Sequence, residues 1–360
     1  MPSKPRIALV HDWLTVYAGA DETLLELHKL FPDAPIYTSL WDKERCPQFK
    51  DATVITSYLQ SLPGATKRHQ LLIPLMPQAF ESFDLKDYDI IISSTTGTAK
   101  GVITQPGQTH ISYCHTPPRY LWNLANDTRS QSSWLRAYVS HKMRVWDVVS
   151  AQRVDQFVAN SHTVEKRINK IYRKEALVIY PPVRTDKYAP TDEKPGDYFL
   201  CVGRHVSYKR VDLAIEACKI TKQPLKIVGS GPETPALMKL AEGCPWIEFM
   251  GYVSDAQLRE LFAKAKAFIF PAEEDFGIVP VEAMSTGRPV IAFGKGGATE
   301  SVKDKVTGTF FAEQTPASLA ETLSAFDPND YDPKAVRAHA LTFDASVFRE
   351  SFKKLVESYS

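Results

Sequence analysis

Two glutamates at a fixed spacing stand out in the second half of the chain. Within PAEEDFGIVPVEAMSTGRPV (271–290), Glu274 and Glu282 flank Gly277 and Pro280. The glycine and the proline indicate a helix start, because a proline in the first helical turn lacks only an N–H that has no partner there. Paired carboxylates can form an acid–base couple, bind a metal or accept hydroxyl groups of a substrate. Their separation across a loop–helix junction favours contact with two ends of one long polar ligand.

Positive charge gathers in VGRHVSYKR (202–210), directly after a predicted buried strand. Arg204 follows the strand, and Lys209 and Arg210 stand at the start of the next predicted helix. Cations at this end of a helix oppose its dipole, so an anionic ligand would account for them. Arginine offers a planar fork and lysine a mobile charge, and both suit a diphosphate. Because Lys209 and Arg210 are adjacent, we expect only one of them to point into the site.

Two glycine turns and one histidine complete the candidate residues. Gly19 lies in VYAGADETL before a helix expected to begin near Asp21, where small residues let backbone N–H groups approach a phosphate. The missing G-x-G-x-x-G pattern disfavours a nicotinamide cofactor. Gly229 in IVGSGPE forms either a turn beside a nucleotide or an ordinary tight turn. His115 ends a predicted strand and is either a functional group or a packed structural residue.

These residues stand at the ends of elements that alternate between strand and helix, which is typical of parallel sheets with crossover helices. The predicted strands lie within 6–14, 34–39, 53–58, 88–95, 109–116, 156–161, 197–204, 224–231, 247–253, 267–273, 289–294 and 308–311. The polar, proline-containing segment 184–197 is the best linker candidate. We therefore predict an α/β protein with two doubly wound Rossmann-like domains, residues 1–184 and 185–342. Residues 343–360 are expected to form a helix that packs back toward the first domain, and the cleft between the two facing domains is the expected site.

The composition is that of a soluble globular protein, with 44% hydrophobic and 24% charged residues among 360. A net charge of +1 excludes a strong nucleic-acid footprint. Residues 1–182 hold 21 basic and 17 acidic side chains, an excess that permits weak contact with an anionic membrane surface. The segment 65–80 could be an interfacial helix or a packed surface element. The odd number of cysteines, five, and the lack of a signal-like or membrane-spanning run favour a reduced, cytoplasmic setting.

The order of the motifs resembles glycosyltransferase family 4, whose members are retaining enzymes of the GT-B fold. The likeness rests on VYAGADETL, YCHTPPRYLW, VANS, VGRHVSYKR, IVGSGPE, GYVSD and PAEEDFGIVPVEAMSTGRPV, which extend over most of the chain. Glu274 and Glu282 match the E-x7-E signature of that family. YCHTPPRYLW is most similar to the GDP-mannose-dependent mannosyltransferases of O-antigen and exopolysaccharide assembly.

The resemblance implies a role for each matching donor-side residue. Arg204 and Lys209 would bind the donor diphosphate, and Glu282 would bind the ribose hydroxyls. Glu274 would hold the transferred sugar together with the backbone of three residues that follow it: Phe276, Gly277 and Ile278. The catalytic set implied in this way is Arg204, Lys209, Glu274 and His115.

The first half departs from the family at one point. The family has Gly-Gly-Ala-Glu in its first loop, and this chain has Ala18-Gly19-Ala20-Asp21. Gly19 would still let the loop approach the donor phosphate, but a Cβ at Ala18 narrows the backbone angles and Asp21 is a shorter acid. The departure affects the placement of the acceptor, which His115 would meet beside the sugar.

The implied reaction is the retaining transfer of a hexose, most closely mannose from GDP-mannose, to a glycan or lipid-linked acceptor in bacterial polysaccharide assembly. The leaving phosphate would accept the proton of the acceptor by front-face attack, without a metal and with the nucleotide sugar as substrate rather than cofactor. A UDP-sugar-dependent glucosyl- or GlcNAc-type transferase is the near alternative, and a GT-B sugar-nucleotide epimerase is a further one. The expected location is cytoplasmic or peripheral at the inner face of the membrane, with no nucleic-acid partner.

Overall fold

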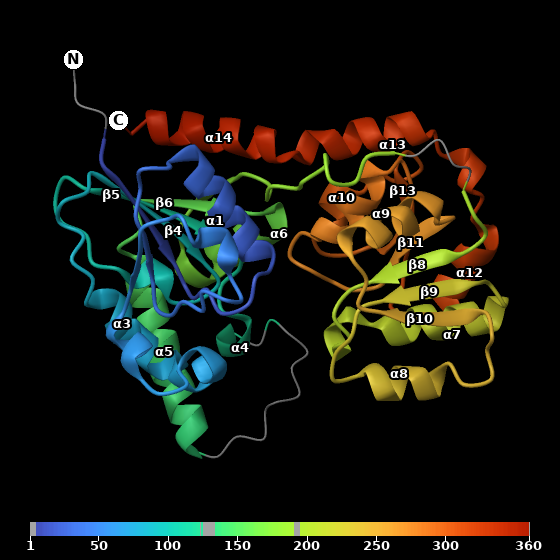
Figure 1. Ribbon diagram of the computed structural model, residues 1–360, viewed down its shortest axis with the longest axis horizontal. Coiled ribbons are helices and arrows are strands. Elements are labelled where there is room, and N and C mark those ends of the chain that lie inside the picture. Colours follow the sequence, from blue (N-terminus) through green and yellow to red (C-terminus); the bar gives the residue numbers. More distant parts are fainter. Residues whose placement is uncertain (1–4, 123, 125–133, 191–194, 360) are drawn as a thin grey trace. The chain divides into compact units, whose positions relative to one another are not determined.

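The computed structural model describes residues 5–122, 124, 134–190 and 195–359. The chain divides into two compact units, shown in Figure 1. Unit 1 comprises residues 1–182 and 346–360, and unit 2 comprises residues 183–345. The chain therefore passes from one unit to the other twice, at 182/183 and at 345/346.

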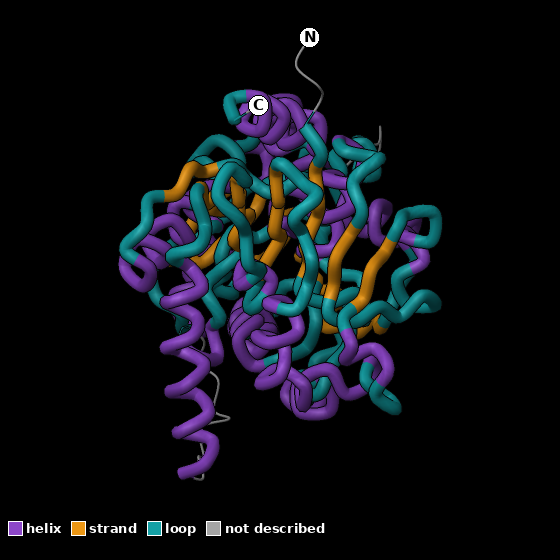
Figure 2. Tube along the Cα trace, turned by 90° about the vertical axis from the view of Figure 1, so that its left-hand side faces the viewer, coloured by secondary structure: helices purple, strands orange, loops and turns teal. Residues whose placement is uncertain are grey.

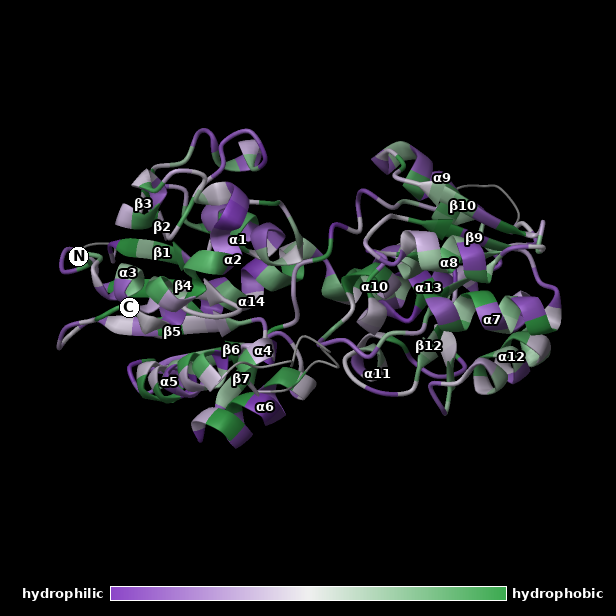
Figure 3. Ribbon diagram, turned by 90° about the horizontal axis from the view of Figure 1, so that it is seen from below, coloured by the Kyte–Doolittle hydropathy of each residue, from purple (hydrophilic) through white to green (hydrophobic). Residues whose placement is uncertain are grey.

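Unit 1 is built on a seven-stranded parallel sheet with the order β3-β2-β1-β4-β5-β6-β7. Its strands are β1 (Ile7–His11), β2 (Ile36–Thr38), β3 (Val54–Thr56), β4 (Ile90–Thr95), β5 (Thr109–Cys114), β6 (Gln156–Ala159) and β7 (Ala176–Val178). Its helices are α1 (Gly19–Leu30), α2 (His69–Leu72), α3 (Met76–Glu81), α4 (Arg119–Trp122), α5 (Trp134–Ala151), α6 (His162–Tyr172) and α14 (Ala345–Glu357). Every residue of β1 and β4 is buried, as expected for parallel strands covered on both faces. Figure 3 shows the hydrophobic character of β1.

Helix α14 closes one face of unit 1. Phe348, Phe352 and Val356 join the core formed by β1, β2, β4 and β5, and both phenylalanine rings lie against Tyr113. Arg349 of α14 pairs with Glu26 of α1, whose side chain is almost fully buried. The C-terminal helix is therefore an integral part of the N-terminal core.

Unit 2 repeats the same winding with six parallel strands in the order β10-β9-β8-β11-β12-β13. The strands are β8 (Phe199–Val202), β9 (Leu225–Val228), β10 (Ile247–Gly251), β11 (Ala267–Phe270), β12 (Val290–Phe293) and β13 (Gly308–Phe311). The helices are α7 (Val211–Thr221), α8 (Thr234–Leu240), α9 (Asp255–Lys264), α10 (Ile278–Ser285), α11 (Ala298–Ser301), α12 (Pro316–Ala325) and α13 (Pro333–Ala340). Ser254 caps α9 through a capping box with Gln257, as its sequence predicts. Figure 2 shows strands with helices on either side of them.

The predicted doubly wound α/β class is confirmed, and all twelve predicted strand segments contain a strand. Three details differ. The short edge strand β7 was not predicted, and α12 and α13 intervene between the last strand and α14. The helix expected from 207 is interrupted, because Arg210 adopts a left-handed conformation with φ of 52° between a 3₁₀ turn and α7.

Two segments of ambiguous sequence are packed against their own unit. In 65–80, Met76, Ala79 and Phe80 are buried in the core of unit 1, although Leu71 remains 73% exposed. In the expected linker, the described residues include Tyr188, which is buried against Phe262 of unit 2. Among the residues that the structure describes, no helix combines the length and the hydropathy needed to cross a bilayer.

The strand orders fix where a ligand site can form in each unit. Each order reverses once, between β1 and β4 in unit 1 and between β8 and β11 in unit 2. In doubly wound sheets, loops diverge at this switch point and leave room beyond the carboxyl ends of the strands. The sequence places polar residues after all four of these strands.

Candidate active site

The switch point of unit 2 brings together a lysine and a glutamate from loops far apart in the sequence. Lys209 lies in the turn after β8, and Glu274 follows β11. The Lys209 ammonium pairs with Oε1 of Glu274, and each side chain is 18% exposed. Partial exposure keeps the pair within reach of a ligand, and a phosphate or a sugar hydroxyl can exchange with either partner.

The two other cations of VGRHVSYKR have partners other than Glu274. Arg204 is exposed, and its Nη2 lies 3.4 Å from the hydroxyl of Tyr208. Arg210 pairs with Asp212, at 2.9 Å between Nη2 and Oδ2. Arg210 has a left-handed backbone with φ of 52°, and the two adjacent cations have different partners. The expectation that one of the two faces the site therefore identifies Lys209.

Gly229 holds the loop after β9 against the loop after β8. Its φ is 121°, and a Cβ there would lie 2.0 Å from the carbonyl oxygen of Gly203. The next turn is fixed by His205, whose Nδ1 lies 2.8 Å from Oγ1 of Thr234. The structure therefore gives Gly229 a steric role in placing Arg204 and Lys209, whether or not a nucleotide also approaches it.

The start of α10 leaves backbone N–H groups without a side-chain cap. Gly277 occupies the N-cap position with φ of 88°, and a Cβ there would approach the ring of Phe270 to 3.1 Å. Phe276 is buried against Phe343, and Ile278 is the first helical residue. The N–H groups at the first turn carry the positive end of the helix dipole, which favours an anionic or oxygen-rich ligand.

Glu282 lies one turn into α10 and contacts a residue that the sequence did not single out. Glu282 lies close enough to the hydroxyl of Tyr188 to interact with it electrostatically. Burial, followed by the charge of Glu282, raises the pKa of Tyr188 above its usual range. Tyr188 belongs to the proline-containing segment predicted as a linker, so only its aromatic character could have marked it. Tyr188 is therefore a neighbour of Glu282 inside unit 2.

His115 lies at the carboxyl end of β5 in unit 1 and is 8% exposed. Its Nε2 lies 2.9 Å from Oγ of Ser94, and its ring contacts Tyr113 edge-on. Burial, followed by the charge of His11, lowers the pKa of His115 to about 3, and the charge of Asp12 opposes the shift. The imidazole is therefore neutral at ordinary pH and acts as a hydrogen-bonding group rather than as a cation.

Asp12, at the switch point of unit 1, was not predicted. Its carboxylate accepts hydrogen bonds from the backbone N–H groups of Thr96 (2.6 Å), Thr98 (2.8 Å) and Ala99 (2.7 Å), and from threonine hydroxyls. It is 3% exposed. This network locks the loop after β4 onto the end of β1, and a lone aspartate after a strand gives no sequence signal for it.

The start of α1 explains the unusual Ala18-Gly19-Ala20-Asp21. Ala18 is the N-cap in an extended conformation with φ of −148°, which any residue adopts, so its Cβ brings no strain. Gly19 is the first helical residue, two positions before the expected start. Asp21 accepts a hydrogen bond from the N–H of Ala18 at 2.8 Å, and its other oxygen lies 3.3 Å from Nε2 of His11. The shorter acid therefore supplies one half of a capping box, and Ala18 has no side-chain acceptor for the other half.

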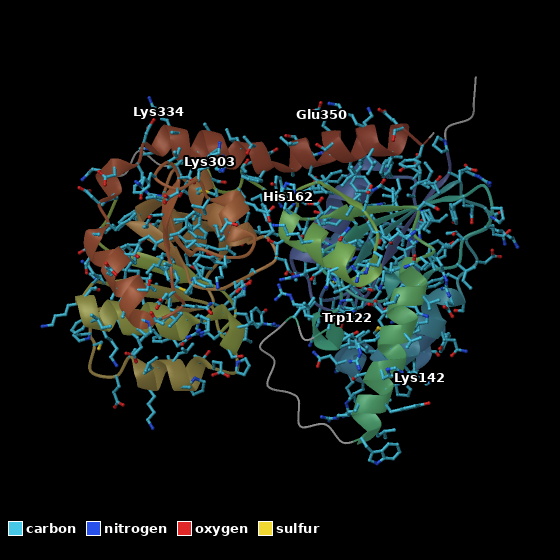
Figure 4. The ribbon with its side chains drawn as sticks, turned by 180° about the vertical axis from the view of Figure 1, so that it is seen from behind. Trp122, Lys142, His162, Lys303, Lys334 and Glu350 are labelled. Carbon is cyan, nitrogen blue, oxygen red and sulfur yellow. The ribbon has the colours of Figure 1, made fainter. Side chains whose placement is uncertain are left out.

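A buried ion pair supports the same loops of unit 1. Lys100 and Asp147 are each 1% exposed, with 2.5 Å between Nζ and Oδ1. Asp147 also accepts hydrogen bonds from Nε1 of Trp122 and from the hydroxyl of Tyr172. Figure 4 labels Trp122 on α4. Among the described residues, no group of histidine, cysteine and acidic side chains could hold a metal ion.

Comparison with known proteins gives this geometry a family. Residues 184–337 match the family model described as glycosyl transferases group 1. The chain is 24% identical to alpha-1,3/1,6-mannosyltransferase ALG2 of Candida glabrata, over 99% of this chain and 90% of that protein. It is 30% identical to O-antigen chain mannosyltransferase RfbU of Salmonella typhimurium, over 40% of this chain and 43% of that protein. The crystal structure of HepE from Anabaena in complex with UDP is similar with a TM-score of 0.73 and 19% identity, over 98% of this chain and 100% of HepE.

Unit 2 therefore carries the group 1 glycosyltransferase domain, and the chain is a glycosyltransferase with the two-domain GT-B fold. The chain is an enzyme of the hexosyltransferase class.

Proposed function

We propose that the chain transfers mannose from GDP-mannose, with retention, to a glycan or lipid-linked sugar acceptor in bacterial polysaccharide assembly. The observation that carries the proposal is the Lys209–Glu274 pair at the switch point of unit 2. The pair supports the proposal because it offers a cation for a phosphate and, shortly before the N-cap residue Gly277 of α10, a carboxylate for a sugar hydroxyl. Mannose is favoured by the similarity to ALG2 and RfbU, which are mannosyltransferases.

The donor would lie along the carboxyl edge of the sheet of unit 2. Lys209 would exchange Glu274 for the donor diphosphate, and the exposed Arg204 would bind the same group. Glu274, released from Lys209, would accept hydroxyls of the sugar together with the backbone of 276–278. Glu282, which lies near Tyr188, would accept hydrogen bonds from the two ribose hydroxyls.

The transition state determines which of these contacts accelerates the reaction. The bond between the anomeric carbon and the phosphate oxygen breaks as the acceptor oxygen bonds to that carbon on the same face. The acceptor proton passes to the leaving phosphate oxygen, so charge and atoms balance without a further base. Negative charge grows on the phosphate, and Lys209 and Arg204 would stabilise that charge electrostatically. No metal or cofactor is needed in this scheme.

His115 would contribute from unit 1 as a neutral hydrogen-bonding partner for the sugar. Its low pKa means that it would not protonate the leaving group at physiological pH. The buried Asp12 network and the capped start of α1 at Gly19 would supply a rigid base for this residue.

Donor identity is tested by thermal shift with GDP-mannose, GDP, UDP-glucose and UDP. A ligand that binds the native state raises the melting temperature by mass action, so GDP-mannose and GDP should raise it and the uridine nucleotides should not. A shift with UDP alone would instead establish a UDP-sugar transferase, a reading supported by the UDP bound to HepE. Consumption of donor without any acceptor, with an epimerised nucleotide sugar as product, would contradict the transferase proposal.

A further inference from the structure

Tyr208 contacts two cations of the candidate site with different parts of its side chain. It belongs to the 3₁₀ turn Ser207–Lys209, and it is half-buried. Nη2 of Arg204 donates a hydrogen bond of 3.4 Å to the Tyr208 hydroxyl. Nζ of Lys209 lies 5.9 Å from the centroid of the Tyr208 ring. The hydroxyl and the ring of one tyrosine therefore each have their own cationic partner.

These two contacts restrict the movement of both cations. A tyrosine hydroxyl that accepts a hydrogen bond from a guanidinium limits the directions that the exposed Arg204 can take. The face of an aromatic ring attracts an ammonium within about 6 Å of its centroid, and this attraction acts on Lys209. Long side chains lose rotamer freedom when they bind a ligand, and this loss opposes binding. Tyr208 therefore reduces the entropy that the two cations lose when an anion binds.

The backbone around Tyr208 is itself held in place. Within the turn, the N–H of Lys209 donates to the carbonyl of Val206 at 3.0 Å. Ahead of the turn, the N–H of His205 donates to the carbonyl of Ser230 at 3.0 Å, which ties the loop after β8 to the loop after β9. The ring of Tyr208 therefore extends from a fixed support, as a residue that orients others requires.

We propose that Tyr208 is a positioning residue that holds Arg204 and Lys209 in one arrangement for the diphosphate of a nucleotide sugar. Its effect is largest when the donor binds, because the Lys209–Glu274 pair then opens. Lys209 loses its carboxylate partner at that step, and the ring of Tyr208 remains beside it. The inference rests on the proposed function for the class of ligand, and it concerns a residue that acts through the two cations rather than on the substrate.

Two other roles of Tyr208 make different predictions. A ring that stacks on the nucleobase would strengthen the binding of GDP but not that of inorganic pyrophosphate, which has no base. A ring that only packs the turn would lower affinity on removal by the same factor whether or not the cations are present. The contacts with Arg204 and Lys209 favour the positioning role over both.

The test measures the affinity of the full chain for GDP, UDP and inorganic pyrophosphate by isothermal titration calorimetry. Tyr208→Phe keeps the ring and removes the hydroxyl, so it should weaken the binding of GDP and of pyrophosphate by about threefold. Tyr208→Leu removes both contacts and should weaken the binding of both ligands by about tenfold. The conservative phenylalanine variant should therefore recover part of the affinity that the leucine variant loses.

Double-mutant cycles assign each contact to its cation. In the Arg204→Ala background, Tyr208→Phe should not weaken pyrophosphate binding further, because the partner of the hydroxyl is gone. In the Lys209→Ala background, Tyr208→Phe should still cost about threefold, and Tyr208→Leu should cost no more than Tyr208→Phe. Losses that are additive in both backgrounds, or weaker binding of GDP with unchanged binding of pyrophosphate, would overturn the inference.

Tyr198 provides the matched control, because it has the same two kinds of contact elsewhere in unit 2. Its hydroxyl donates to the carbonyl of Leu261 at 2.9 Å, and Nζ of Lys226 lies 4.8 Å from its ring centroid. Tyr198→Phe and Tyr198→Leu should leave all three affinities within about twofold of the wild type. Losses as large as those of the Tyr208 variants would contradict a specific role of Tyr208.

The three ligands separate failure of this inference from failure of the proposed function. If UDP binds in place of GDP, GDP-mannose is not the donor, and the same losses measured with UDP and pyrophosphate support the role of Tyr208. If the wild type binds GDP and both Tyr208 variants bind it equally well, the inference is wrong and the proposed donor stands. A wild-type chain that binds none of the three ligands would overturn both.

Discussion

The two units share one strand order, but they use its switch point differently. In unit 2, the point holds the partly exposed Lys209–Glu274 pair, and the exposed Arg204 follows β8. In unit 1, the equivalent point holds the buried Asp12, whose carboxylate is occupied by backbone N–H groups and hydroxyls of one loop. The polar side chains at the switch point of unit 2 can therefore exchange partners with a ligand, whereas the carboxylate of Asp12 in unit 1 holds a loop in place.

The difference shows that the strand order determines where polar residues gather, but not whether they bind a ligand or stabilise the fold. A ligand can replace one partner of an exposed ion pair at small cost, because water screens the exchange. It cannot replace three backbone hydrogen bonds to a buried carboxylate without leaving unsatisfied donors. We therefore expect changes at the switch point of unit 1 to affect stability, and changes at that of unit 2 to affect catalysis.

The largest expected effect is on stability and comes from Asp12→Ala. The substitution leaves the N–H groups of Thr96, Thr98 and Ala99 without their acceptor, at about 3 kcal/mol or more of unfolding free energy. Urea unfolding followed by circular dichroism measures this loss in the transition of unit 1. Asp51→Ala removes an exposed acid from the same unit and serves as the control, with an expected change below about 0.5 kcal/mol. Equal stability of the two variants would mean that Asp12 does not hold the loop.

The second largest expected effect is on kcat and comes from substitutions in unit 2. Lys209→Ala and Arg204→Ala should each lower kcat by about 10² or more, because each removes a cation that would stabilise the leaving phosphate. Folding should be retained, since Arg204 is exposed and Lys209 is partly exposed.

Arg210→Ala is the matched control for these two variants. Arg210 follows Lys209 directly but pairs with Asp212, so its removal should leave kcat within about threefold of the wild type. If Lys209→Ala turned over like Arg210→Ala, the assignment of the diphosphate site would fail.

The sequence predicts the fold well because parallel strands are continuous apolar runs. Strands such as β4 and β12 read directly as IIISST and VIAF, and both are fully buried. The edge strand β7 has the three residues ALV, none of them buried, so its signal is too short. Helix ends were also readable where a capping residue such as Ser254 precedes them.

The sequence predicts residues of the candidate site only where charged residues cluster directly after a predicted strand. That pattern picked out Lys209, Arg204 and Glu274, but it could not tell which of two adjacent cations meets Glu274. The answer depends on the left-handed backbone at Arg210, which no local rule predicts for an arginine. Asp12 and Tyr188 were missed because each acts through a partner more than 80 residues away in the sequence.

The third effect separates the units by acid sensitivity. The folded pKa of His115 is about 3, below the value near 6.5 of the unfolded chain, so only the unfolded chain binds a proton as the pH falls below 6.5. The neutral, buried His115 therefore costs no free energy of unfolding above pH 6.5. As the pH falls toward 3, protonation of the unfolded chain lowers the free energy of unfolding, by about 2 kcal/mol between pH 6.5 and 5. Burial also lowers the pKa of His110 in β5 to about 3, so His110 destabilises unit 1 in acid in the same way. We therefore expect unit 1 to unfold before unit 2 as the pH falls.

This expectation is checked by urea unfolding at pH 7 and pH 5. His115→Asn should lose less stability than the wild type over this range, by about 2 kcal/mol. His162→Asn, in the same unit but with a 58% exposed side chain, should show the full wild-type loss. An identical pH dependence in the wild type and His115→Asn would show that His115 is not held neutral by burial.

The smallest effect tests whether unit 2 also contains a positioning residue of the kind seen in unit 1. Tyr188→Phe removes the hydroxyl that interacts with Glu282 and should weaken donor binding about fivefold, with kcat unchanged. Isothermal titration with GDP and steady-state kinetics separate these two quantities. Tyr198→Phe, whose hydroxyl bonds only the carbonyl of Leu261 among the described contacts, is the control and should bind GDP normally.

A double-mutant cycle makes this last comparison decisive. If Tyr188 acts through Glu282, Tyr188→Phe should have no further effect on donor affinity once Glu282 is replaced by alanine. Additive losses would show that Tyr188 acts on the packing of unit 2 instead. In that case, the acid of unit 2 would be free to reorient with the ligand, and a fixed carboxylate would be a property of unit 1 alone.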